Sequence, residues 1–139
     1  MRILLAPDSF KEAASAEAIA QAMARGIKRG DPQAECRLLP LSDGGEGLTH
    51  ALVHATGGTL HDVETVDAIG RPITAQFGFL GNNHASCILH TAVVELASAS
   101  GLERVSPADR NALVASTFGT GLLIRAAIDA GADCIVLGL

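Results

Sequence analysis

The stretch Cys36-Arg37-Leu38-Leu39-Pro40-Leu41-Ser42-Asp43-Gly44-Gly45-Glu46-Gly47 joins a short apolar segment to a glycine-rich run that leads into a helical pattern. Apolar runs of this length are typical of buried strands, and glycine permits the sharp turn between strand and helix. The three glycines let backbone N–H groups approach an anion, while Asp43 and Glu46 suit a divalent cation bound to that anion. The run predicts a magnesium-phosphate site, and the alternative interpretation is a tight turn with a solvated Asp43 cap.

A second polar cluster follows the first strand-like segment of the chain. Residues 2–6 are mainly apolar and have the length of a buried strand, and Asp8, Ser9 and Lys11 come shortly after them. Open α/β sheets bind ligands at the carboxyl ends of their strands, which is where Asp43 also lies. We therefore expect Asp8 and Asp43 to line one crevice as hard-metal ligands, with Lys11 as a cation that reaches a phosphate.

The segments that follow these strands have helical spacing. Ser15 is a candidate N-cap for residues 16–29, whose apolar side chains recur at i, i+4 and i+8, and Gly30 is a candidate left-handed stop. Residues 46–56 show the same kind of pattern, and Gly57 ends it. Helices that join short buried strands predict a parallel sheet, so we interpret residues 1–58 as the first part of a flavodoxin-like α/β domain with helices on both faces of the sheet.

The hydrophobic period changes in the middle of the chain. Residues 72–79 alternate between apolar and polar side chains, which is typical of a strand with one buried face, and residues 59–66 and 92–95 indicate further strands. We therefore assign residues 59–139 to the start of a β-richer α/β second domain, of the α+β type. In an alternative arrangement, residues 110–139 pack back on the first sheet.

Residues 117–121 form a second candidate anion site. Thr117, Gly119, Thr120 and Gly121 precede a helical pattern, and the start of a helix offers several N–H groups that lack intrahelical partners. The alternative is an N-cap with a flexible turn, and these residues alone do not separate the two interpretations.

Length and composition exclude several classes of protein. Of the 139 residues, 48% are hydrophobic and 18% are charged, which excludes a disordered tail. A net charge of -5 with scattered basic residues argues against a nucleic-acid partner, and no apolar run has the length of a membrane span. The three cysteines lie far apart, without the spacing of a disulfide framework or a zinc site, so we expect reduced thiols and a cytoplasmic protein.

Five motifs occur in the order found in bacterial glycerate kinases, and together they resemble that family over nearly the whole chain. The motifs are Ala6-Pro7-Asp8-Ser9-Phe10-Lys11, Asp43-Gly44-Gly45-Glu46-Gly47, Val94-Glu95-Leu96-Ala97-Ser98-Ala99-Ser100-Gly101-Leu102, Arg110-Asn111 and Thr117-Phe118-Gly119-Thr120-Gly121. The resemblance implies an enzyme that uses ATP and Mg²⁺ to phosphorylate D-glycerate, giving 2-phosphoglycerate. The chain has no Walker A sequence, so its ATP site would use another architecture.

The resemblance also implies roles for single residues. Asp8, Lys11 and Asp43 are the expected catalytic residues, with both aspartates near Mg²⁺ and Lys11 on a phosphate or on the glycerate carboxylate. The residues leave open which aspartate acts as the base. The expected substrate or phosphate contacts are Ser9, Gly44, Gly45, Glu46, Gly47, Glu95, Thr117, Gly119, Thr120 and Gly121.

Two features depart from the family pattern. Family members are much longer and continue with a glycine-rich segment after the strand that matches residues 134–138, and Ala85–His90 is an insertion. We therefore expect the 139-residue chain alone to be an inactive fragment that forms oligomers or aggregates through the apolar edge of that strand. The rival interpretation is a non-catalytic flavodoxin-like module that binds an anion or a partner.

Overall fold

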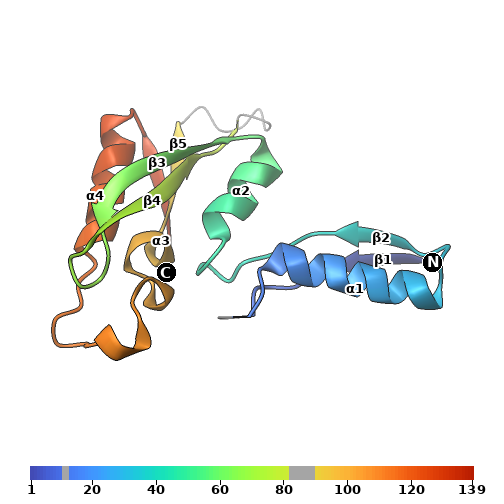
Figure 1. The fold of residues 1–139 in the computed structure, drawn as a ribbon. Coiled ribbons are helices and arrows are strands. Elements are labelled where there is room, and N and C mark those ends of the chain that lie inside the picture. The colour runs from blue at the N-terminus through green and yellow to red at the C-terminus, as the bar shows by residue number, and fades with distance from the viewer. Residues whose placement is uncertain (11–12, 82–89) are drawn as a thin grey trace. The chain divides into compact units, whose positions relative to one another are not determined.

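The computed structural model describes residues 1–10, 13–81 and 90–139 and has the mixed α/β architecture that the sequence predicts (Figure 1). The described residues form two compact units, Met1–Asp43 and Gly44–Leu139. None of the helices in these ranges combines the length and the apolar character that a membrane crossing needs.

The first unit consists of two parallel strands and the helix that connects them. Its elements are β1 (Arg2–Leu5), α1 (Ala16–Gly30) and β2 (Glu35–Leu38). The strands pair in register from Arg2 with Glu35 to Leu5 with Leu38, which confirms the predicted parallel β-α-β order. Among the described residues of this unit, α1 is the one helix that packs with the strands. The expectation of helices on both faces of a larger sheet therefore stays a prediction for the whole protein.

Helix α1 begins at the predicted cap but ends differently. The Ser15 hydroxyl accepts a hydrogen bond from the Ala18 N–H at 3.3 Å, which satisfies one of the donors at the helix start. The sequence suggests that Gly30 stops the helix in a left-handed conformation. Instead, Gly30 is the last helical residue, and the helix ends because the backbone becomes extended at Asp31.

The second unit is built on one mixed sheet with the strand order β3-β4-β5-β6. Its strands are β3 (Thr59–Val66), β4 (Pro72–Phe79), β5 (Thr91–Glu95) and β6 (Cys134–Gly138); its helices are α2 (Leu48–Thr56), α3 (Leu96–Ser100) and α4 (Phe118–Asp129), with short 3-10 helices η1 (Leu102–Arg104) and η2 (Pro107–Asp109). β4 pairs antiparallel with β3 and β5, whereas β6 pairs in parallel with β5. The chain after residue 110 therefore adds β6 to this sheet and not to the first one.

Helices cover both faces of this sheet (Figure 1). On one face, Phe77 of β4 and Val94 of β5 belong to the main hydrophobic core together with Leu123 of α4, and all three side chains are buried. On the other face, α2 approaches β4 so closely that a Cβ on Gly78 would overlap the side chain of Val53. The helices and the sheet thus form three layers.

The boundary between the two compact units precedes α2. The sequence pattern places a domain boundary near Gly58, whereas the compact units divide between Asp43 and Gly44. The reason is the contact of α2 with β4, where Gly78 leaves space for Val53. The limits of the domains in the whole protein stay a prediction.

Helix α4 starts in close contact with β3. The Thr65 hydroxyl donates a hydrogen bond to the Gly119 carbonyl at 2.9 Å, and a Cβ on Gly119 would overlap the carbonyl oxygen of Val66. Gly121 lies two residues further along the same helix, is exposed and has open space where its Cβ would be. Packing therefore requires glycine at position 119 but not at position 121.

A buried carboxylate holds the turn between β3 and β4. Asp67 Oδ1 accepts hydrogen bonds from the N–H groups of Ile69 and Arg71, each at 2.9 Å, and Asp67 Oδ2 accepts one from Arg71 Nε at 2.7 Å. Burial alone would raise the pKa of this carboxyl. The hydrogen bonds and the charge of the Arg71 guanidinium outweigh burial and hold the pKa of Asp67 below its usual value.

We expect Gly119→Ala to destabilise the second unit, and Gly121→Ala, its matched control, to stabilise it slightly. A methyl group at position 119 would push α4 away from β3, and overpacking of this kind costs about 1–3 kcal/mol. At position 121 the methyl group meets open space, and replacing a glycine inside a helix contributes about 0.5–1 kcal/mol. Urea unfolding measures both differences in free energy, and equal effects of the two substitutions would contradict this account.

We expect Asp67 to make the stability of the second unit fall in acid. A carboxyl whose pKa is lower in the folded protein contributes stability above its unfolded pKa of about 3.9, and this contribution is lost as the pH falls through the lower folded value. Asp67→Asn is therefore expected to be less stable at neutral pH and to lose less further stability in acid. Asp129→Asn, which removes an exposed ion pair with Arg125, is the control. Urea unfolding at several pH values measures the free energy of unfolding of each variant. If this free energy falls equally in acid for the wild type and Asp67→Asn, Asp67 is not the source of the pH dependence.

Candidate functional site

Asp8 ties together the two loops that follow the strands of the first unit. Its Oδ1 accepts a hydrogen bond from the Ser9 N–H at 2.6 Å, and its Oδ2 accepts one from the Asp43 N–H at 3.3 Å. This proximity follows from the parallel pairing of β1 with β2, because both strands then end at the same edge of the sheet. The structure thus brings Asp8 to the backbone of Asp43, the second of the predicted catalytic residues.

Two of the predicted features fall outside the described residues. Lys11 is one of them, so its place relative to Asp8 stays a prediction. The other is the insertion at Ala85–His90, of which the structure describes His90 only. The His90 ring stacks on Phe79 with a centroid separation of 3.7 Å, and its Nδ1 lies 2.9 Å from the Gly131 carbonyl oxygen.

Glu95 binds the start of helix α2 and is nearly enclosed by protein. Its Oε1 accepts a hydrogen bond from the Gly47 N–H, and its Oε2 accepts one from the Thr49 N–H, each at 3.1 Å. Only 5% of Glu95 is exposed. The sequence suggested that this carboxylate faces a ligand, but in the structure both of its oxygens face the backbone of α2.

The glycine-rich run packs against the end of strand β6. Gly44 has a φ of +112°, a left-handed conformation that favours glycine, and its carbonyl occupies the space where a Cβ on Gly138 would be. Gly138 is the register partner of Glu95 across the parallel pair of β5 and β6. The Gly45 carbonyl accepts a hydrogen bond from the Leu48 N–H at 3.3 Å. The run is therefore fixed to the second sheet by backbone contacts.

Glu46 lies among other acidic groups. Partial burial raises its pKa, and the neighbouring carboxylates of Glu103 and Glu95 raise it further, against the opposing effect of Arg104. These carboxylates repel an anion at this end of the run. Within the part of the chain that the structure describes, no three His, Cys, Asp or Glu side chains gather in an arrangement that could hold a metal ion.

A polar pocket lies at the start of helix α4. It has a volume of about 400 Å³, and its lining includes the residues Ser100, Ser116 and Thr117 together with Ala68 and Ala115. The Ser116 Oγ accepts a hydrogen bond from the Phe118 N–H at 3.1 Å. Hydroxyl groups beside the first turn of a helix of this length can bind an anion, because N–H groups there lack intrahelical partners.

The four residues predicted around this helix start divide into two kinds. Thr117 and Gly121 are exposed, and Thr117 lines the polar pocket. Gly119 and Thr120 are buried, and the Thr120 Oγ1 lies 2.8 Å from the Ser100 Oγ. Gly119 and Thr120 thus contribute packing and hydrogen bonding behind the pocket.

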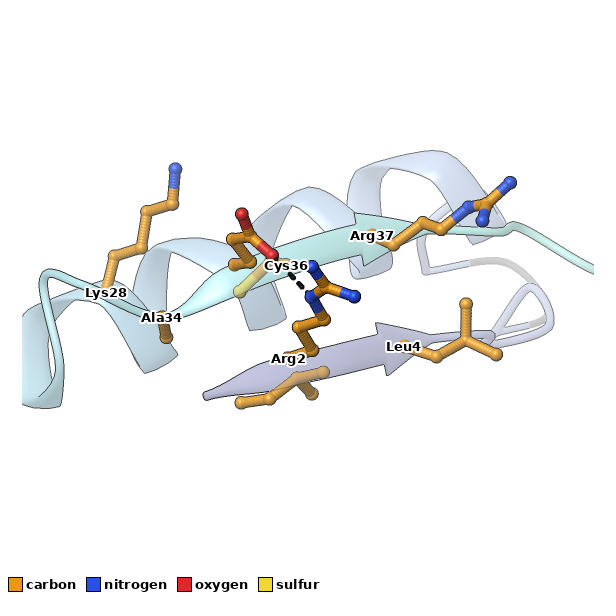
Figure 2. A pocket seen from close by; sticks show the side chains of 8 residues that line it. Arg2, Leu4, Lys28, Ala34, Cys36 and Arg37 are labelled. Atoms are coloured by element: carbon orange, nitrogen blue, oxygen red, sulfur yellow. Dashed lines mark hydrogen bonds and ion pairs between the residues drawn. The ribbon is translucent and has the colours of Figure 1, made fainter.

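A second pocket, larger than the polar one, lies in the first unit away from the predicted residues. It has a volume of about 730 Å³ and runs along β1 and β2 (Figure 2). Arg2 and Glu35 form an exposed ion pair there at 3.0 Å, marked by a dashed line in Figure 2. Asp8 and Asp43 follow the opposite ends of these strands and do not line it.

Two hydroxyl groups in the polar pocket, those of Ser100 and Ser116, belong to residues outside the predicted site. Ser116 immediately precedes residues 117–121, and a predicted anion site that began one residue earlier would have included it. Ser100 lies in one of the five family motifs, but it ends α3 and reaches the pocket only through the tertiary fold, so the motif did not mark its hydroxyl as a site residue. The capping role of Glu95 was likewise hidden, because its partners lie 46 and 48 residues earlier in the chain.

Comparison with known proteins gives one consistent result. The model of the glycerate kinase family matches residues 3–139. The chain is 45% identical to a glycerate kinase of Bacillus subtilis (strain 168) and 38% identical to glycerate 2-kinase of Escherichia coli (strain K12), in both cases over 139 residues. Each alignment covers 100% of this chain and 35% of the relative, so the chain spans about a third of the length of these relatives.

A solved structure gives the same picture for the fold. It is the crystal structure of a protein from Salmonella typhimurium LT2 assigned as glycerate kinase 2, with 43% sequence identity and a TM-score of 0.68. The match covers 99% of this chain and 36% of that protein.

Proposed function

The chain belongs to the glycerate kinase family, and we propose that the whole protein transfers the γ-phosphoryl group of ATP to D-glycerate. The observation that carries this proposal is the family match over residues 3–139, with 45% identity to the Bacillus subtilis glycerate kinase. The glycerate 2-kinase of Escherichia coli, at 38% identity, supports the 2-hydroxyl as the acceptor and 2-phosphoglycerate as the product. Because ATP is the proposed donor, we place the reaction in the cytoplasm.

In this proposal the two aspartates of the first unit carry the chemistry. Phosphoryl transfer depends mainly on positioning and on stabilising charge, so the enzyme must hold an acid near the attacking hydroxyl. Asp8 accepts hydrogen bonds from Ser9 and Asp43, which fixes its carboxylate beside the Asp43 segment. Either aspartate can orient or deprotonate the acceptor hydroxyl. Lys11, as a cation, neutralises a phosphate or the glycerate carboxylate.

The donor set of these aspartates fits Mg²⁺. Magnesium is usually bound by one or two carboxylates and by the phosphates of the substrate, rather than by a complete protein cage. The hydrogen bond between Asp8 and the Asp43 N–H brings two segments with carboxylates together, so Asp8 and Asp43 would hold the ion. When bound, Mg²⁺ neutralises negative charge on the phosphates.

Two groups of residues are proposed to contact the anionic parts of the substrates. Gly44 and Gly45 are the proposed backbone donors of the glycine-rich run, because glycine lets the backbone approach an anion closely. The Gly47 N–H donates a hydrogen bond to Glu95. The pocket at the start of α4 is the second group. Its support is the lining by hydroxyls, Thr117 among them, and none of the described residues that line it is acidic.

We expect Asp43→Asn in the whole protein to lower turnover by on the order of 10²-fold or more, because the transition state loses charge stabilisation. Asp31→Asn makes the same chemical change in the same unit and is expected to keep full activity. The Asp31 carboxylate accepts a hydrogen bond from the nearby N–H of Gln33 and is not a predicted site residue. An assay that couples ATP consumption to D-glycerate phosphorylation measures both variants, and phosphorus NMR identifies the product.

Three outcomes would count against this proposal. Near-normal turnover of Asp43→Asn would reduce Asp43 to a turn residue. Formation of 3-phosphoglycerate would contradict the acceptor. Tight binding of inorganic phosphate without Mg²⁺ and without turnover in the wild type would favour a non-catalytic anion-binding module.

A further inference from the structure

Helix α2 starts without a capping side chain of its own. Its N-cap residue is Gly47, in the left-handed conformation with a φ of +89°, and glycine has no side-chain oxygen to accept a hydrogen bond. The first N–H groups of a helix have no intrahelical partners, so they require an acceptor from elsewhere. Glu95, at the end of β5, supplies both oxygens to this turn.

The environment of Glu95 matches a role inside the protein and not at a ligand surface. A buried carboxylate is costly unless hydrogen bonds compensate for the loss of water. The N–H groups of Gly47 and Thr49 provide them, and the positive end of the helix dipole adds a favourable interaction. Glu95 therefore holds the same position that an anion would hold at an open helix start.

We propose that Glu95 is a positioning residue that fixes the glycine-rich run 44–47 for catalysis and keeps anionic ligands away from the start of α2. This inference rests on the proposed kinase function. The run is held at one end by Glu95 and packs along Gly138 at the end of β6, so its backbone geometry depends on the Glu95 carboxylate. Anionic parts of the substrates then bind to other groups of the protein.

Replacing the carboxylate and then returning it as a free molecule tests the proposal. In the whole protein, Glu95→Ala leaves the N–H groups of Gly47 and Thr49 without an acceptor and leaves a cavity of carboxylate size. We expect kcat per folded enzyme to fall about tenfold or more with little change in KM, because misplacing a positioning loop affects the transition state most. Hydrogen exchange at these two N–H groups is expected to accelerate.

Formate, a small free carboxylate, is expected to restore part of kcat and to slow this exchange again in Glu95→Ala. Chloride at the same ionic strength is expected to do neither. The wild type is expected to show no response to formate, because its own carboxylate occupies the helix start. Glu64→Ala removes an exposed carboxylate of the same unit and is the matched control, with kcat and exchange unchanged.

Three results would contradict the positioning role of Glu95 or the kinase function on which it rests. If Glu95→Ala keeps the wild-type kcat per folded enzyme, the positioning role is wrong. If this variant does not fold, Glu95→Gln, which keeps one acceptor oxygen, replaces it, and full kcat in Glu95→Gln overturns the proposal. If the wild type lacks glycerate kinase activity, the proposed function fails, and hydrogen exchange with and without formate then decides the capping role of Glu95 by itself.

Discussion

The hydrogen bonds from two N–H groups at the start of α2 to the Glu95 carboxylate organise the second unit. They connect the first turn of a helix to the end of a central strand, and they place the glycine-rich run beside β6. The absence of a Cβ at Gly138 and at Gly78 lets the run and α2 approach the sheet closely. One charged side chain and two glycines thus set the position of a loop that family resemblance links to catalysis.

Two helix starts in the second unit have opposite chemical character. At α2 the N–H groups meet the carboxylate of Glu95, and Glu46 and Glu103 add negative charge nearby. At α4 the described lining residues carry hydroxyls or small side chains, and Thr117 is one of them. Glycine and acidic residues at a helix start therefore do not by themselves mark an anion-binding site, because a carboxylate of the same chain can accept the hydrogen bonds of the helix N–H groups.

The parts of the structure that the sequence predicts well depend on local chemistry. The Ser15 cap, the alternation along Pro72–Phe79 and the apolar run Cys134–Gly138 each contain their own signal, and each appears in the structure. The pairing of β1 with β2 also follows from local order, since a single helix joins them. Long-range features were missed. The partners of Glu95 and the division at Asp43 depend on packing between segments that are distant in sequence.

The distance along the chain between α2 and its capping carboxylate constrains the order of events during synthesis. The acceptor comes from a residue made 46 to 48 positions after the N–H groups that it binds. A helix of nine residues without its own N-cap is marginal in water, so α2 has little reason to persist as the nascent chain emerges. The pairing of β1 with β2, by contrast, is complete within the first 38 residues. Translation therefore delivers both strands of the first unit early, whereas α2 waits for Glu95, and a ribosome that pauses between the two exposes the glycine-rich run while it still lacks its anchor.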